Sequence, residues 1–191
     1  MRFNYDRLSH HIKLLISAAI MLFSSLGWAI PFDDAVAANS RGDYSVELNI
    51  TRPLAAKGEA WAQFFLGTSY ASGKGVAKSD VEALKWYRLS AAQGYPAAQF
   101  NLGVSYVNGR GVMRDYAEGL KWYRLAAAQG FAEAQYNLGS FYTEVLQDYT
   151  EAVKWYLLAA AQGLAQAQSN LGTMYSNGHG VPQDHTEAVK W

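Results

Sequence analysis

Four copies of one sequence pattern occupy most of this chain of 191 residues. Each copy begins at a glycine, continues as a variant of A-x-A-Q-x-x-L-G-x-x-Y, and carries the pair K-W further along. The starting glycines lie 36, 36 and 33 residues apart. A unit repeated at this interval predicts a solenoid, in which each unit buries its apolar side against its neighbours. The starting glycines are Gly58, Gly94, Gly130 and Gly163, and the tryptophans are Trp86, Trp122, Trp155 and Trp191.

Each copy predicts a pair of antiparallel helices. In the copy that begins at Gly58, Ala62, Leu66 and Tyr70 recur every four residues and place an apolar stripe on a first helix. The loop G-K-G-V follows, and its glycines can adopt the positive φ that turns the chain. A second helix then runs back along the first.

Sequence signals mark both the start and the end of the second helix. An Asp or Ser is followed three residues later by Glu, which is the pattern of a capping box. A Gln-Gly pair marks the end, because glycine readily adopts the left-handed conformation after a helix. Trp86, Tyr87 and Leu89, with their counterparts, are predicted to fill the space between adjacent repeats. The predicted caps are Ser79, Asp115, Asp148 and Asp184.

Composition excludes several classes of function. The 16 basic and 16 acidic residues give a formal net charge of zero, without the basic excess typical of nucleic-acid-binding domains. We therefore expect no nucleic-acid partner. The sequence contains no cysteine, which excludes disulfides, thiolate metal sites and a cysteine nucleophile.

Residues 1–29 are predicted to form a cleaved signal peptide. Basic residues precede an uncharged, mainly apolar stretch of 16 residues that ends in Gly27, Trp28 and Ala29. A basic head, a short apolar run and small residues before the cut are typical of such a signal. The alternative is an uncleaved anchor, although a membrane span takes about 20 apolar residues. We expect an exported, periplasmic protein, with secretion or anchoring through this N-terminal segment as alternatives.

The repeated residues resemble the Sel1-like repeat (SLR) family, a branch of the TPR-type solenoids. The resemblance rests on A-x-A-Q-x-N-L-G-x-x-Y, N-G-R-G-V and D-Y-x-E-x-x-K-W-Y-R-L-A-A-A-Q-G taken together. It implies an all-α, right-handed superhelical α/α solenoid of antiparallel helix pairs, with a concave face that binds a protein or an extended peptide segment and with no chemistry of its own. The resemblance covers residues 58–191, in repeats of about 58–93, 94–129, 130–162 and 163–191.

Three departures from the pattern carry information. Residues 31–57 read as N-terminal capping helices, a degenerate repeat in which Pro53 replaces a leucine, and such changes are tolerated at the exposed end of a solenoid. The copy that begins at Gly130 lacks three residues and the G-x-G-V loop, which predicts a tighter crossing and a different local curvature. The chain stops at Trp191 in the middle of a second helix, and we expect truncation of a longer array.

One position on the first helix suggests a partner-binding surface. Asparagine occupies it in three copies and Phe65 in the first, and the resemblance implies that this helix lines the concave face. An asparagine ladder can grip the backbone of an extended peptide. The alternative is that the asparagines bond to the adjacent repeat's loop and hold the stack in register. Phe65 is a candidate for contact with a partner or for burial against the cap. The asparagines are Asn101, Asn137 and Asn170.

A second candidate surface lies on the second helix. Arg88 and Arg124 occupy equivalent positions there and can bind a partner carboxylate, although exposure to solvent is the ordinary role of such residues.

No motif indicates catalysis, a cofactor or a metal. The G-x-G loops lack the third glycine of a dinucleotide fingerprint, and the repeated glutamates have a capping role. His179 and His185 have no further ligand at metal-binding spacing. We therefore expect no catalytic, cofactor-binding or metal-binding residues, and a non-catalytic exported scaffold for protein–protein interaction, in envelope assembly or signalling regulation. The alternative is a cell-wall-associated hydrolase or penicillin-binding protein, as suggested for cysteine-rich relatives, whose cysteine pairs are absent here.

Overall fold

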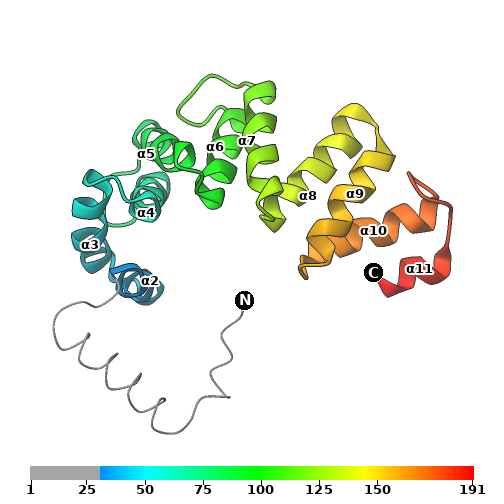
Figure 1. Cartoon of the computed structure of the whole chain (residues 1–191), viewed down its shortest axis with the longest axis horizontal. Helices are drawn as coiled ribbons and strands as arrows, with labels where there is room; N and C mark the ends of the chain where they lie inside the picture. Colours follow the sequence, from blue (N-terminus) through cyan, green and yellow to red (C-terminus); the bar gives the residue numbers. More distant parts are fainter. Residues whose placement is uncertain (1–30) are drawn as a thin grey trace, which may run out of the picture. The chain divides into compact units, whose positions relative to one another are not determined.

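The computed structural model describes residues 31–191, so the predicted signal peptide lies outside the described residues. Over this part of the chain there are ten α-helices, one π-helical turn and no β-strand (Figure 1). The all-α fold predicted from the sequence is therefore confirmed. The chain divides into two compact units, with the boundary between Thr51 and Arg52.

A buried polar side chain joins the two helices of the first unit. Glu47 is fully buried, and its carboxylate accepts a hydrogen bond of 3.1 Å from the side-chain amide of Asn39. Pro53 lies further along the same helix as Glu47 and does not end it. The helix instead continues for three residues beyond the proline. The two helices are α2 (Pro31–Arg41) and α3 (Tyr44–Ala56), of which α3 crosses the boundary.

The second unit is a row of four helix pairs. Each helix packs against the helix before it and the helix after it in the sequence, which is the arrangement of an α/α solenoid. We term the first helix of each pair helix A and the second helix B. Repeat one consists of α4 (Ala60–Ser72) and α5 (Asp80–Ala92), repeat two of α6 (Pro96–Asn108) and α7 (Tyr116–Ala128), repeat three of α8 (Ala132–Phe141) and α9 (Tyr149–Ala160), and repeat four of α10 (Ala165–Asn177) and α11 (His185–Lys190).

The predicted capping boxes start all four helices B. In repeat two the Asp115 carboxylate accepts a hydrogen bond of 3.0 Å from the backbone N–H of Glu118. Equivalent bonds of 3.2, 3.0 and 2.9 Å start the other three. Each capping-box glutamate also pairs with the lysine three residues later, at 2.6 to 3.6 Å. These pairs are exposed to solvent and add little to stability.

A glycine of helix A and a tyrosine of helix B fit together inside each of the first three repeats. A Cβ atom added at Gly103 would lie 2.6 Å from the ring of Tyr123, which is too close for any real contact. Glycine therefore leaves room for a ring that is only 5% exposed. The other two pairs, Gly67 with Tyr87 and Gly139 with Tyr156, show the same fit at 2.8 and 2.6 Å.

The prediction that Leu89 fills the space between adjacent repeats is wrong. Leu89 is 45% exposed, and its counterparts Leu125 and Leu158 are exposed to a similar degree. Tyr87 is buried as predicted, and Trp86 is half-buried. Leu89 follows Tyr87 by two positions, which corresponds to roughly 200° around a helix, so the two side chains point in nearly opposite directions.

A glutamine in helix A ties neighbouring helix ends together. Gln99 Nε2 donates to the carbonyl oxygen of Ala91, at the end of helix B in the preceding repeat, at 3.3 Å. Its Oε1 accepts from Gln129 Nε2, at the end of helix B in its own repeat, at 2.8 Å. The amide of Gln99 is 5% exposed, so these bonds satisfy a buried polar group. The same two bonds form around Gln63 and Gln135.

The G-x-G loop of repeat two packs closely on repeat one. Gly109 and Gly111 both have positive φ, of 68° and 70°. A Cβ atom at Gly111 would collide with the backbone carbonyl of Asp80, whereas at Gly109 the nearest atoms lie 3.5 Å away. Gly180 of repeat four meets the carbonyl of Tyr149 in the same way. The second glycine of the loop is therefore required by close approach as well as by backbone conformation.

Repeat three replaces this loop with a π-helical turn. The turn η2 (Tyr142–Leu146) continues α8 directly, and only Gln147 and Asp148 separate it from α9. Gln147 adopts a left-handed conformation with φ of 54°, and Asp148 caps α9. The link to helix B is thus two residues long, against seven in the other repeats, and helix A with its π-helical turn spans 15 residues against 13.

Candidate functional site

Three pockets lie at equivalent places in the second unit, each between two consecutive repeats. The first pocket, between repeats one and two, and the second, between repeats two and three, each have a volume of about 370 Å³. The third, between repeats three and four, has a volume of about 200 Å³. We refer to them as the first, second and third inter-repeat pockets.

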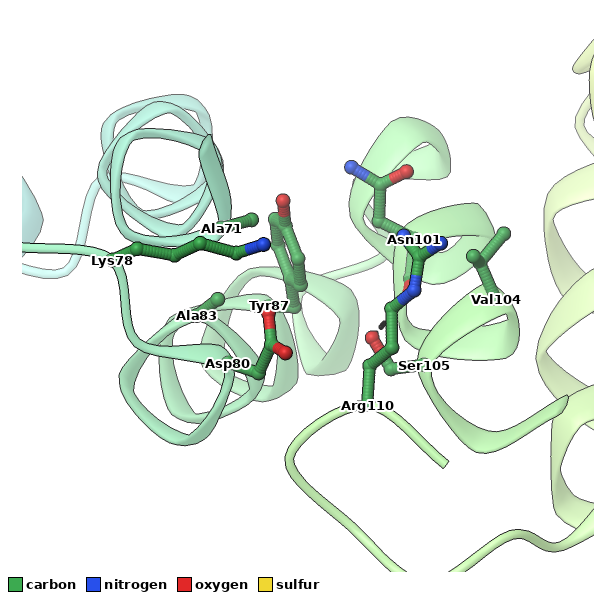
Figure 2. Close-up of a pocket in the computed structure, with 9 residues that line it drawn as sticks. All are labelled: Ala71, Lys78, Asp80, Ala83, Tyr87, Asn101, Val104, Ser105 and Arg110. Atoms are coloured by element: carbon green, nitrogen blue, oxygen red, sulfur yellow. Dashed lines mark hydrogen bonds between the residues drawn. The ribbon is translucent and has the colours of Figure 1, made fainter. Parts of the chain in front are cut away.

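All three pockets share one frame. A tyrosine from helix B of one repeat and an asparagine from helix A of the next line each of them. In the first pocket the Tyr87 ring and the Asn101 side chain project into the same space from facing helices (Figure 2). The pairs are Tyr87 with Asn101, Tyr123 with Asn137, and Tyr156 with Asn170.

Burial shifts the pKa of the tyrosine hydroxyls in the first two pockets. It raises the pKa of Tyr87, and the neighbouring Thr68 and Asn101 side chains act in the opposite direction without cancelling the shift. Burial likewise raises the pKa of Tyr123, and the Asn137 side chain opposes it. Each asparagine thus lies beside a tyrosine of the preceding repeat.

The first pocket has a charged lining. Lys78 extends toward the Tyr87 ring, the Asp80 carboxylate lies beside it, and the Arg110 guanidinium lies next to Asn101 (Figure 2). Lys78 comes from the loop before α5 and Arg110 from the G-x-G loop of repeat two, and both are exposed. The two cations and one carboxylate give this pocket a net charge of +1.

The second pocket is mainly apolar. Val107, Tyr116, Phe141 and Val145 line it, together with the single charged side chain Glu144. Glu144 and Val145 belong to the π-helical turn of repeat three. Where the first pocket receives Arg110 from a G-x-G loop, the second therefore receives an acidic and an apolar side chain from the turn that replaces such a loop.

The third pocket is smaller and mixed in character. It is lined by Thr143, Thr173 and Met174, with Glu144 and His179 as its titratable groups besides Tyr156. His179 sits in the G-x-G loop of repeat four and stacks on the ring of Tyr149, with ring centres 4.7 Å apart. A loop residue thus again contributes to the lining.

The remaining predicted site residues lie outside the linings of these pockets. Phe65 is half-buried and packs edge-on against Trp61 and Phe64, with ring centres 6.1 and 5.8 Å away. Arg88 Nη2 donates to the hydroxyl of Tyr106 in the next repeat at 2.9 Å. Arg124 makes the equivalent bond of 3.2 Å to Tyr142. Both arginines therefore bridge neighbouring repeats.

Sequence reasoning missed the pocket residues that differ between repeats. Lys78 and Arg110 line the first pocket beside Tyr87 and Asn101, but they come from two different loops. The available signal was the variable residue inside each G-x-G loop, which changes while the glycines around it stay the same.

Among residues 31–191, no three His, Asp or Glu side chains gather closely enough to hold a metal ion. None of the helices in this described part is long and apolar enough to cross a bilayer.

Comparison with known proteins identifies the repeats. Four stretches match the sequence model of the Sel1 repeat, at residues 62–95, 96–131, 132–164 and 165–191. Two solved structures are similar: c5321, described as a protective antigen present in uropathogenic Escherichia coli strains and displaying an SLR fold, and a Sel1 repeat protein from Oxalobacter formigenes. Both are 40% identical to the chain, with TM-scores of 0.74 and 0.71. The matches cover 78% and 76% of this chain but 32% and 43% of the two proteins. Comparison with curated proteins gives no match.

Proposed function

Because the chain belongs to the Sel1 repeat family, we propose that it is an exported, non-catalytic scaffold that binds an extended segment of another protein along its inter-repeat pockets. A constant frame with a changing lining supports this function. Each pocket keeps its Tyr–Asn pair, while the surrounding side chains are charged in the first, apolar in the second and mixed in the third. Three such pockets in a row can each bind a different side chain of one extended segment.

The Tyr–Asn pair suits the backbone of such a segment. An asparagine amide offers two N–H donors and a carbonyl acceptor. Asn101 is half-buried at the boundary between two repeats, where its amide can contact both the preceding repeat and a bound peptide. The two roles that the sequence suggested for the asparagines, holding the stack and gripping a peptide, are therefore compatible.

Export is supported by the basic and apolar character of residues 1–29. It also accords with the description of c5321 as a protective antigen, since such an antigen has to be accessible to the immune system. N-terminal sequencing of the protein recovered from the periplasm tests this part: the expected first residue is Ile30. Recovery of the intact N-terminus from the cytoplasm would contradict export.

Site-specific photocrosslinking in living cells tests the binding surface. A photoreactive amino acid at Tyr116, which lines the second pocket and is 50% exposed, is expected to capture a partner. The matched control is Leu125, which lies outside the lining of the pocket on the same helix and is 43% exposed. Mass spectrometry then identifies the captured segment, and a synthetic peptide of that sequence should bind the purified protein. Equal capture from both positions would contradict recognition at the pockets.

The catalytic alternative has its own test. The purified protein is expected to leave peptidoglycan intact and to remain unlabelled by a fluorescent penicillin. Turnover of the first or covalent labelling by the second would replace the scaffold with a hydrolase or a penicillin-binding protein.

A further inference from the structure

The first inter-repeat pocket holds two cations that take no part in the ion pairs of the described residues. Those pairs join an arginine or lysine to an acidic residue at most three positions away, and neither Lys78 nor Arg110 is among them. Asp80 is the one acidic side chain in the lining, so the pocket keeps an excess of positive charge. A partner group with negative charge would complete it.

Neutral polar side chains line the same space. In the view of Figure 2 the Asn101 amide lies next to Arg110, and the Tyr87 side chain lies next to Lys78. The positive charge of Arg110 acts on Tyr87 of the first pocket and on Tyr123 of the second. A planar guanidinium, an ammonium and an amide are the groups that bind a carboxylate well.

The second pocket favours a different side chain. Tyr116 and Val145 are 50% and 60% exposed there, although both are large and apolar. Glu144 is the charged member of this lining and repels a carboxylate. The two adjoining pockets therefore differ both in polarity and in the sign of their charge.

We propose that the first inter-repeat pocket binds a carboxylate of the partner and the second binds a large apolar side chain of the same segment, which fixes its direction. This inference rests on the proposed function and narrows it to one class of peptide. Helix α6 separates the two pockets, since Val104 lines the first and Val107 the second. A helix with its side chains is about 10–12 Å wide, which an extended chain crosses in about three to four residues.

A peptide array tests the proposal with the full chain. Short synthetic peptides carry one Glu, Lys or Ser and one Phe or Ser, separated by about two to six residues in both orders. Each is made with a free and with an amidated C-terminus, which distinguishes a terminal carboxylate from a side-chain carboxylate. The expected best ligands combine an acidic group with Phe in one order, at least about tenfold tighter than the Ser analogues. Their affinity should fall as salt is added.

Paired variants assign the preference to the pocket. Lys78→Gln combined with Arg110→Gln should weaken binding of the acidic peptides about tenfold and abolish their advantage over the Ser analogues. Lys78→Glu with Arg110→Glu should shift the preference to Lys peptides while the requirement for Phe stays. The control, Lys85→Gln with Lys121→Gln, removes the same charge from helix surfaces where both lysines already pair with glutamates. It should leave the preference unchanged, and circular dichroism confirms that all variants are folded.

The outcomes separate this inference from the function on which it rests. If Phe peptides bind but Glu and Ser peptides bind equally, the carboxylate pocket is wrong and the scaffold stands. If the variant with Lys78→Gln and Arg110→Gln still prefers acidic peptides, the assignment of the carboxylate to the first pocket is also wrong and the scaffold stands. If no peptide in the set binds, both the inference and the proposed mode of binding are overturned.

Discussion

Tyr87 and Asn101 line the same pocket, although the two residues belong to different repeats. The tyrosine ring packs against Gly67 of its own repeat, and its hydroxyl also donates to Thr68 at 3.4 Å. The ring also belongs to one buried cluster with Leu102 of α6, so this side chain connects the core of repeat one to helix A of repeat two. Tyr87 also lines the first pocket, so the core and the proposed binding site share this residue.

Stability at high pH should depend on Tyr87. Burial raises its pKa, so the folded protein holds this proton more tightly than the unfolded chain does. The resulting stabilisation is complete below the ordinary tyrosine pKa of about 10 and is lost as the pH rises through the raised value. We expect the free energy of unfolding, measured by urea titration, to fall less steeply above about pH 10 in Tyr87→Phe than in the wild type. The control is Tyr116→Phe, at an exposed position; a slope in Tyr87→Phe equal to that of the wild type would contradict the assignment.

Gly103→Ala should destabilise the protein by about 1–3 kcal/mol, because the new methyl group overlaps the ring of Tyr123. Gly172→Ala is the matched control in repeat four. There the nearest atom to the new Cβ is a backbone oxygen at 3.1 Å, and no tyrosine ring is in the way. Thermal unfolding followed by circular dichroism compares the two. Equal losses of stability would show that the ring is not what requires glycine.

Gln99→Ala should cost about 1–2 kcal/mol, since it removes the bonds to the Ala91 carbonyl and the Gln129 amide, although each of these groups keeps a bond to Gly94. Gln168→Ala provides the comparison, because Gln168 is half-buried and its bond to the Ala160 carbonyl is long, at 3.5 Å. We expect a clearly smaller loss there in urea denaturation. A similar loss at both sites would argue against the glutamine bonds as a source of stability.

Gly111→Ala should be more damaging than Gly109→Ala. Both glycines have positive φ, so each substitution carries a backbone cost of about 1 kcal/mol. Only at Gly111 does the added Cβ also collide with the Asp80 carbonyl. The difference between the two melting temperatures measures the close approach of the loop to repeat one. Indistinguishable values would mean that the loop can move away without loss.

Gln147→Gly should stabilise repeat three. Gln147 is the one residue other than glycine with positive φ in the described part of the chain. Glycine adopts this conformation without strain, but it loses more conformational entropy on folding than glutamine does. The net effect is an increase of about 0.5–1 kcal/mol in the free energy of unfolding. Differential scanning calorimetry would detect it as a higher melting temperature. Gln162→Gly, at the end of α9, serves as the control and should destabilise, because Gln162 Nε2 donates to Gln135.

Much of the architecture was predictable because it is encoded locally. The capping boxes, the glycine loops and the spacing of the four copies lie within short stretches, and the family identified from them is confirmed. The burial of Leu89 was predicted wrongly, since a pattern of apolar residues does not reveal which face of helix B meets solvent. The role of Gln99 was missed because its two partners lie 8 and 30 residues away.

The candidate site was predictable only in part. The asparagine position emerged from aligning the copies, because it recurs. Lys78 and Arg110 come together only when two repeats stack, and no periodic signal marks either residue. Predictions about residues 1–29 lie outside the described structure, and the roles of Phe65, Arg88 and Arg124 toward a partner stay predictions.

The paired glycines of each G-x-G loop also shape how such proteins can diversify. The glycines meet every geometric demand of the turn, and the residue between them is Arg110 in one copy and His179 in another. A substitution at that position changes the charge of the neighbouring pocket while both glycines of the loop are kept. Under the proposed mode of binding, ligand preference can therefore evolve one loop at a time.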